Sequence, residues 1–453
     1  MSNKLSITKL RKTFKHVIAP KDADYDKART AVAGDIDRRP AVIIKVTNVN
    51  EVAQVIALVK ETGLELAVRS GGHSAFCVND GGILLDVSLM KNLQIDANTK
   101  TAWAESGLTA AEYTRAVAEH GFATGFGDTG SVGIGGITLG GGVGFLVRKH
   151  GLTIDNLLAV EVVTADGKIL QADESNHADL FWAMRGGGGN FGVATKFKFQ
   201  LQDLGQAYGG MLFLPATAET VASFLREADS APEALSTIAN VMTAPPMPFL
   251  PEDVVGKPIL MAMMFYAGDP AQGEQAMTPF RNLATPYADM LRPMAYPEMF
   301  PPENGEYHPI AANRTMFLDY VDVSVAETIL SHLKKSTGMM AVSQLRVLGG
   351  AMTRIPADVT AYAHRKSKIM ANLAALYQDL NEKSVHETWV DEFENAIRQS
   401  DKGKYVNFIN TIGEKELEAA YPASTLEKMR HVKAKYDPTN LFRMNQNISP
   451  SNQ

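Results

Sequence analysis

The stretch Leu66 to Asp86 reads LAVRSGGHSAFCVNDGGILLD, and it decides the fold. An apolar strand is predicted at 64–68 and a second strand at 83–87, with a glycine-rich turn between them. Two glycines leave no side chain beside His73, and glycine is used where the main chain takes positive φ or lies directly against a ligand. The pattern predicts an imidazole at the floor of a cleft walled by backbone. Taken alone, the segment also fits a tight hairpin with an incidental exposed histidine.

A second glycine-rich stretch, GFGDTGSVGIGGITLGGGVGFLVRKHG, runs from Gly125 to Gly151. Its segment 130–144 holds eight glycines. Because glycine costs about 1 kcal/mol per residue in a helix interior, we expect that this segment is not selected for helix stability. Apolar residues stand between the glycines, whereas a flexible linker would be polar there. The stretch is therefore predicted to approach a large ligand, since backbone N–H groups at such turns can hold a pyrophosphate.

Together the two stretches resemble a known family. The motifs RSGGHS at 69–74 and TGSVGIGGITLGGG at 129–142 are similar to those of flavoproteins of the vanillyl-alcohol-oxidase fold. The similarity is to the berberine-bridge-enzyme-like branch, which includes 6-hydroxy-D-nicotine oxidase. It continues through 155–156, the glycine-rich 185–192, and YDPTNLFR at 436–443. It covers about the first 200 residues and about the last 50.

The resemblance implies an FAD cofactor. In this family the histidine of the first motif is bonded covalently to the flavin 8-methyl carbon, and His73 occupies its place. Bicovalent members add a cysteine where this chain has Thr129, so we expect a single attachment, with Cys77 a buried small hydrophobe. The cofactor-binding residues implied by the family motifs are Arg69, Ser70, Gly71, Gly72, His73, Ser74, Thr129, Gly130, Val132, Gly133, Gly135, Gly136, Gly140, Gly141, Gly142, Gly144, Asn156, Gly192, Val193 and Asn447.

The resemblance places the chemistry in the C-terminal part of the chain. Residues 404–411, KYVNFINT, are expected to form a strand beneath the flavin ring, where substrate lies. Plant relatives read Y-x-N-Y with the second tyrosine as catalytic base, but here Phe408 stands at that position. Tyr405 and Asn407 are the candidate catalytic residues. Either an amine substrate needs little help with its proton, or another group takes it, and the candidates are Tyr307, His308, Tyr320, Tyr362 and His364.

Local patterns predict the elements around these motifs. Residues 25–39 carry mixed charge and are interpreted as a surface connection. A helix is predicted over 51–61, capped by Asn48 or Asn50 and ended at Gly63, because its apolar residues recur on one face. With the strands on either side, this helix predicts a β-α-β start.

We predict an α+β protein of two domains. Residues 1–205 are expected to form the N-terminal part of an FAD-binding domain of the PCMH or vanillyl-alcohol-oxidase type. Residues 206–403 have less glycine and more methionine, and are expected to form a substrate domain with an antiparallel sheet. Residues 404–453 return to the first domain, which makes that domain discontinuous and places the cleft between the two.

Composition limits the partners and the location. The 453 residues are 45% hydrophobic and 21% charged with a formal net charge of -6, which is ordinary for a globular protein. Charges of both signs are mixed along the chain, so neither a nucleic-acid surface nor a membrane surface is predicted. No secretory leader or membrane-length apolar run is visible, and a single cysteine excludes an internal disulfide. We therefore expect a cytoplasmic protein.

The resemblance implies an FAD-dependent oxidase. It would remove a hydride from an alcohol or amine carbon of a small organic substrate and pass the electrons to O2, giving H2O2. Val132, three residues after Thr129, matches the residue found in members that react readily with oxygen. Two alternatives stay open: a dehydrogenase with another electron acceptor, and a non-catalytic protein that binds flavin or nucleotide.

Overall fold

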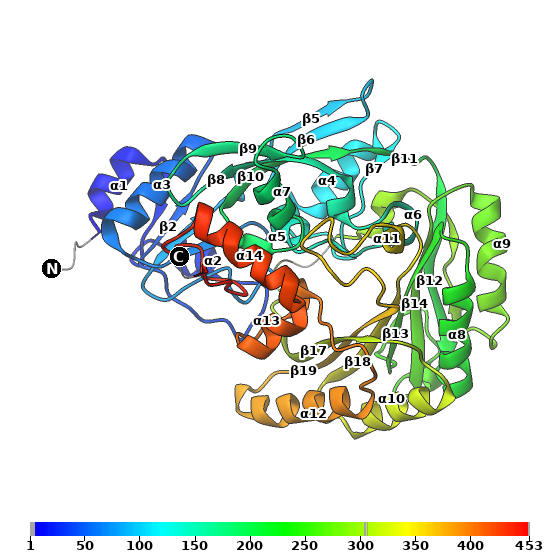
Figure 1. Cartoon of the computed structure of the whole chain (residues 1–453). Coiled ribbons are helices and arrows are strands. Elements are labelled where there is room, and N and C mark those ends of the chain that lie inside the picture. The colour runs from blue at the N-terminus through cyan, green and yellow to red at the C-terminus, as the bar shows by residue number, and fades with distance from the viewer. Residues whose placement is uncertain (1–4, 303–304, 306, 452–453) are drawn as a thin grey trace.

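The computed structural model describes residues 5–302, 305 and 307–451 and contains both helices and sheets. In Figure 1 the large sheet that contains β12 to β14 and β17 to β19 stands apart from the sheets of the N-terminal half. The C-terminal helices α13 (Glu414–Ala420) and α14 (Ala423–Tyr436), drawn in orange and red, lie back toward that half. The α+β class and the antiparallel sheet that we predicted are confirmed.

The first sheet carries the strand that leads into His73. Its order is β1-β2-β4-β3, with β1 at His16–Ile18, β2 at Val42–Lys45, β3 at Leu66–Arg69 and β4 at Ile83–Asp86. Strands β2, β4 and β3 are parallel, and helix α3 (Val49–Thr62) connects β2 to β3, which confirms the β-α-β start. The helix begins at Asn48, whose side chain accepts a hydrogen bond from the backbone N–H of Glu51. It ends at Gly63, which takes the left-handed conformation.

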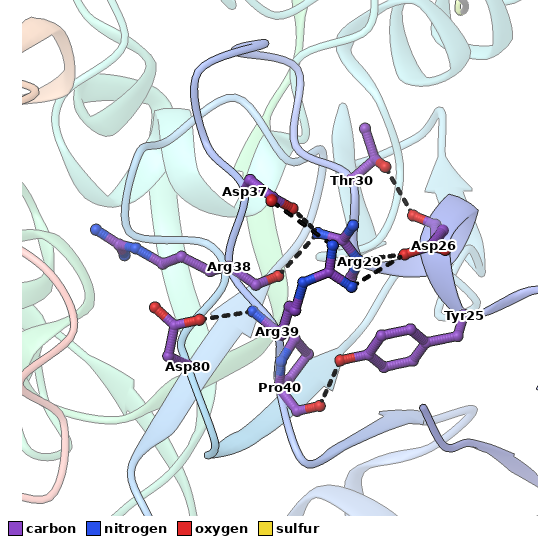
Figure 2. Close-up of polar contacts among 9 residues, drawn as sticks. All are labelled: Tyr25, Asp26, Arg29, Thr30, Asp37, Arg38, Arg39, Pro40 and Asp80. Carbon is purple, nitrogen blue, oxygen red and sulfur yellow. Dashed lines mark hydrogen bonds and ion pairs between the residues drawn. The ribbon is translucent and has the colours of Figure 1, made fainter. Parts of the chain in front are cut away.

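Residues 25–39 are more ordered than the surface connection that we predicted. They begin with helix α2 (Tyr25–Arg29), and the buried Tyr25 donates its hydroxyl hydrogen to the carbonyl of Pro40 at 2.7 Å. Figure 2 shows Arg29 at the centre of the segment, where it donates to Asp26, to Asp37 and to the carbonyl of Arg38. The charged side chains of this segment therefore pair with one another, although the carboxylates of Asp26 and Asp37 remain exposed on the surface.

The second sheet is antiparallel, in the order β5-β6-β10-β8-β9. Its strands are β5 at Leu93–Asp96, β6 at Thr101–Glu105, β8 at Leu157–Val163, β9 at Ile169–Asp173 and β10 at Val193–Gln200. Helix α4 (Ala110–Ala118) begins with a capping box between Thr109 and Glu112. Tyr113 of this helix packs edge-to-face on Phe126 and Phe199, so the helix and the sheet share one core.

The glycine-rich stretch contains a short helix, α5 (Ile134–Leu139), in a segment where helix stability was not expected. The helix begins after Gly133, where the second glycine stretch packs directly against the first. A Cβ atom on Gly71 would lie 2.2 Å from the backbone nitrogen of Gly133. A Cβ on Gly133 would lie 2.0 Å from the hydroxyl oxygen of Ser70. Only glycines allow the two backbones to approach so closely.

The large sheet contains eight antiparallel strands. They are β12 at Ala207–Pro215, β13 at Leu235–Thr243, β14 at Pro258–Tyr266, β15 at Ala288–Asp289, β16 at Arg292–Met294, β17 at Ile310–Leu318, β18 at Met340–Val347 and β19 at Ile369–Tyr377. The helices that share its core are α8 (Ala218–Ser230), α9 (Pro270–Arg281), α10 (Val323–Lys335) and α12 (Lys383–Ala396), which lie on its outer side in Figure 1.

The remaining helices and strands are short. They are α1 at Ile7–Thr13, β7 at Phe122–Ala123, α6 at Val147–His150, α7 at Ala178–Met184, β11 at Gln202–Asp203 and α11 at Ala351–Arg354. Single 3-10 turns lie at Thr153–Asn156, Gly188–Asn190, Glu252–Val254, Tyr296–Met299, Leu380–Glu382 and Val406–Phe408.

The strand predicted at 404–411 is wrong. This segment contains a 3-10 turn, Val406–Phe408, closed by the bond from the backbone N–H of Phe408 to the carbonyl of Tyr405 at 2.9 Å. The side chain of Tyr405 is buried and bonded to the second glycine stretch, which holds the segment away from any sheet edge.

Candidate active site

A cavity of about 540 Å³ lies between the glycine stretches and the large sheet. This is an ordinary size for a ligand site. Its walls come from both glycine stretches, the turn at 187–194, the C-terminal segments 405–410 and 442–446, and side chains of β17, β18 and β19. Segments that are far apart in the sequence therefore meet at one place.

Many of the residues predicted from the sequence reach this cavity. Those that line it are Ser70, Gly71, Gly72, His73, Ser74, Thr129, Val132, Gly133, Gly135, Gly136, Gly192, Val193, Tyr405 and Asn407. Those that are not among its lining residues are Arg69, Gly130, Gly140, Gly141, Gly142, Gly144, Asn156 and Asn447. The side chain of Asn156 instead makes hydrogen bonds within the protein, to the carbonyls of His150 and Leu152 and to Gln202.

His73 lies in a turn that is held from two sides. Its Nε2 atom is 2.9 Å from Oγ of Ser131, in the second glycine stretch. On the strand before His73, the buried Arg69 forms an ion pair with Asp86 at 2.7 Å. Arg69 also donates hydrogen bonds to the carbonyls of Ala28 and Thr30, which lie in the segment 25–39. In the part of the chain that follows His73, the carbonyl of Val78 accepts a hydrogen bond from Arg38 at 2.9 Å. Although burial alone raises the pKa of Asp86, the guanidinium of Arg69 holds that pKa below its ordinary value.

The positions of Thr129 and Cys77 bear on the predicted single attachment of the flavin. Thr129 lines the cavity, and its hydroxyl donates to Oδ1 of Asp128 at 3.3 Å. Cys77 is 4% exposed, and burial raises the pKa of its thiol to about 11. A thiol in this state is a poor nucleophile at neutral pH, which agrees with the prediction of a buried small residue.

Tyr405 brings the C-terminal segment into the cavity wall. Its hydroxyl oxygen accepts hydrogen bonds from the N–H groups of Gly142 at 2.9 Å and Val143 at 3.3 Å. It also accepts one from Nδ2 of Asn407 at 2.8 Å. Burial raises the pKa of Tyr405, while these three donors act in the opposite direction. The arrangement keeps the phenol protonated near neutral pH and would stabilise its anion when it forms.

The run Gly140 to Gly142 packs against other parts of the protein. A Cβ atom on Gly140 would lie 2.0 Å from Oδ1 of Asn407, and one on Gly141 would lie 2.9 Å from the ring of Tyr362. Gly140 therefore allows Asn407 to approach, Gly141 leaves room for the ring of Tyr362, and the N–H of Gly142 donates to the Tyr405 hydroxyl.

The other candidate proton acceptors lie elsewhere. Tyr307, His308 and Tyr320 are exposed, and burial raises the pKa of Tyr362. His364 shares a hydrogen bond with the carbonyl of Ala420 at 2.8 Å, and burial lowers its pKa. None of these five described residues is among those that line the cavity.

The sequence reasoning missed the polar wall formed by the large sheet. Gln344 and Arg346 of β18, Asn372 of β19 and Asn313 of β17 line the cavity opposite the glycine stretches. A signal was present in β18, because polar residues two positions apart, within an apolar strand, point to the same face.

The cavity fits a dinucleotide such as FAD. Backbone forms much of its wall, and a Cβ on Gly136 would have no atom within 4 Å, so this glycine leaves open space for a ligand. The side-chain oxygens of Asn445 and Asn447 are buried and have no hydrogen-bond partner within the part of the chain that the structure describes, and Asn445 lines the cavity. A donor group of bound flavin would satisfy such an oxygen.

Among the residues that the structure describes, no group of three or more His, Cys, Asp or Glu side chains is placed to hold a metal ion. No helix in these ranges combines the length and the apolar character needed to cross a membrane.

Comparison with known proteins agrees with the geometry. The chain matches the FAD binding domain model over residues 40–173 and the berberine and berberine like model over 404–449. It is 29% identical to (R)-6-hydroxynicotine oxidase of Paenarthrobacter nicotinovorans, over 96% of each chain. It is 28% identical to an FAD-linked oxidoreductase of Dictyostelium discoideum, over 92% of this chain and 90% of that one.

Solved structures give the same result for the fold. The structure of 6-hydroxy-D-nicotine oxidase from Arthrobacter nicotinovorans superposes with a TM-score of 0.85 at 25% identity, covering 96% of this chain and 98% of that one. BBE-like 1 of Physcomitrella patens, at 21% identity, superposes with a TM-score of 0.87 and covers 99% of this chain and 100% of that one. The chain thus has the vanillyl-alcohol-oxidase fold and FAD as its cofactor, and it is an FAD-linked oxidoreductase similar to 6-hydroxynicotine oxidase and the berberine-bridge-enzyme-like proteins.

Proposed function

We propose that this protein is an oxidase that removes a hydride from an alcohol or amine carbon of a small polar molecule and passes both electrons to O2. For a secondary alcohol, one molecule of the alcohol and one of O2 give one molecule of the ketone and one of H2O2. Bound FAD supplies the hydride acceptor. The observation that carries the proposal is that one cavity is lined by the His73 turn, by Tyr405 and by the polar wall of the large sheet. Further support comes from Val132 in the cavity wall and from the similarity to a 6-hydroxynicotine oxidase.

We propose that Tyr405 takes the substrate proton and that Asn407 positions its hydroxyl. The three N–H groups on the Tyr405 oxygen would stabilise its phenolate, which is the form that accepts the substrate proton and becomes the neutral phenol. We also propose that His73 carries a single covalent bond to the flavin, which replaces one hydrogen of its 8-methyl group and releases two electrons for O2 to accept. Residues 1–205 with 404–453 would then form the FAD-binding domain, and 206–403 the substrate domain.

The test is an anaerobic absorbance screen of the purified yellow protein against sugars, sugar acids, phenolic alcohols and cyclic amines. Bleaching of the flavin band, followed by stoichiometric H2O2 when air is admitted, is the expected result. Bleaching without H2O2 would replace the oxidase with a dehydrogenase. If no compound in the panel bleaches the flavin, the non-catalytic alternative gains support.

A further inference from the structure

The sheet side of the cavity contains a buried cation. Arg346 of β18 has a side chain that is 5% exposed, and its Nη2 atom forms an ion pair with Asp128 of the second glycine stretch. Apart from His73, these are the only acidic or basic side chains among the described residues that line the cavity. The pair therefore spans the space between the glycine stretch and the large sheet, where substrate would lie.

Asp128 satisfies only part of this guanidinium. The Nε and Nη1 atoms of Arg346 are buried and have no hydrogen-bond partner among the described residues. The guanidinium carbon lies 5.0 Å from the centre of the Phe408 ring, which also lines the cavity. Buried donors of a charged group usually have a hydrogen-bond partner, so two unpaired nitrogens on one guanidinium beside a cavity leave room for a ligand there.

Amide side chains surround this cation on the same face of the sheet. Gln344 precedes Arg346 by two residues and lies directly opposite Asn240 of β13 and Asn372 of β19. Nε2 of Gln344 donates to Oδ1 of Asn240 at 2.9 Å. Oδ1 of Asn372 is buried without a partner among the described residues. The wall thus contains two donors, Nε and Nη1 of Arg346, and one acceptor, Oδ1 of Asn372, that have no partner among the described residues.

We propose that Arg346 binds the carboxylate of the substrate and that Asn372 accepts a hydrogen bond from a hydroxyl or N–H group of the same molecule. The substrate class is then a small hydroxy acid or amino acid, and this inference rests on the proposed function. Guanidinium pairs with carboxylates through parallel N–H groups, and Arg346 retains two nitrogens for that purpose. Because these nitrogens are covered, binding includes a turn of the guanidinium along the Phe408 ring into the cavity.

The test compares each acid that reduces the flavin with its own amide or methyl ester. We expect Arg346→Gln to raise the apparent Kd of the acid by about 10- to 100-fold, as expected for charge-assisted hydrogen bonds, and to change that of the neutral analogue little. The variant Asp128→Asn and the double variant that carries both Arg346→Gln and Asp128→Asn complete a double-mutant cycle. In the double variant no carboxylate is left unpaired at position 128, so a persistent loss for acids alone assigns the effect to substrate binding. Equal losses for acid and amide, or recovery in the double variant, would make Arg346 a structural partner of Asp128.

A second measurement separates this inference from the proposed function. Unreactive carboxylates, from acetate to benzoate, are titrated into the flavin-loaded protein while its visible absorbance and its Tm are recorded, with acetamide and benzamide as matched controls. We expect the carboxylates alone to perturb the wild-type spectrum, and Arg346→Gln to abolish the effect. If no carboxylate binds, the inference fails even if alcohols or amines reduce the flavin. If carboxylates bind but no compound reduces the flavin, the proposed function fails and the anion site stands.

Discussion

Nε2 of His73 and Oγ of Ser131 lie 2.9 Å apart, so the second glycine stretch fixes the orientation of the imidazole in the first. The contact is possible because Gly71 and Gly133 allow the two backbones to meet. The position of His73 relative to a bound flavin is thus set by residues about 60 positions further along the chain.

We predict that FAD is bonded covalently to His73. Acid precipitation should leave the yellow colour in the wild-type pellet, whereas His73→Ala should release it to the supernatant. Ser131→Ala removes the orienting hydrogen bond, which is worth about 1 kcal/mol, and should slow covalent incorporation about fivefold without preventing it. Colour that leaves the wild-type protein on precipitation would refute the bond.

The attachment is predicted to be at one point only, because Thr129 stands where bicovalent relatives have cysteine. Digestion and mass spectrometry should find the flavin on the peptide that contains His73 and on no second residue. Thr129→Cys places a thiol in the cavity wall, and its flavin peptide shows whether a second bond forms. A flavin already linked to two residues in the wild type would contradict the prediction.

Tyr405→Phe should slow flavin reduction by about 10²- to 10⁴-fold, the usual contribution of a general base. Because burial raises the pKa of Tyr405, the wild-type rate should still be rising above neutral pH, and this rise should disappear in the variant. Stopped-flow absorbance across pH provides the measurement. An unchanged rate in Tyr405→Phe would instead mean that the substrate loses its proton unaided, which favours amines over simple alcohols.

Phe408→Tyr provides the matched test, since it restores the phenol of the plant relatives. The ring at this position lies 5.0 Å from the guanidinium carbon of Arg346. A cation at that distance should lower the pKa of the new phenol relative to its ordinary value of about 10. Combined with Tyr405→Phe, it should recover part of the lost rate and shift the pH profile toward acid. A double variant as slow as Tyr405→Phe would show that position 408 cannot reach the substrate.

Folding stability should fall on mild acidification because of His150. Burial lowers the pKa of His150 to about 4, compared with about 6.5 in the unfolded chain. Between these values the unfolded state binds a proton that the folded state does not, so the free energy of unfolding decreases as pH falls from 6.5 to 4, by about 3 kcal/mol in total. Urea unfolding at several pH values should show this slope, and His150→Gln should flatten it. His431→Gln, at an exposed position, is the control and should leave the slope unchanged.

Sequence patterns correctly predicted the helices and strands whose conformation depends on residues that are close together in the sequence. Helix α3 was predicted at 51–61 and spans Val49–Thr62, because Asn48, the apolar stripe and Gly63 all lie within it or at its ends. The segment 404–411 was predicted wrongly because its conformation depends on a bond between Tyr405 and Gly142, more than 260 residues apart in sequence. No window of sequence contains both partners.

Only part of the site was predicted from the sequence. Family motifs placed His73 and Thr129 in what proved to be one cavity. They carried no information about Gln344, Arg346 and Asn372, because these residues lie in the part of the chain where the resemblance is faint. Their common position depends on the register of β18 and β19, which is visible only in the folded sheet.

The buried bonds of Lys433 make one side chain a support for the cavity wall. Its ammonium group is fully buried, where it contacts Asp437 and the carbonyls of Asn190 and Phe442, and so fixes residues 433–442 against the glycine turn at 187–190. Residues 187–190 and the segment 442–446 belong to the cavity wall. These two parts of the wall cannot separate without leaving a buried charge unpaired, so the ion pair keeps the cavity closed on this side.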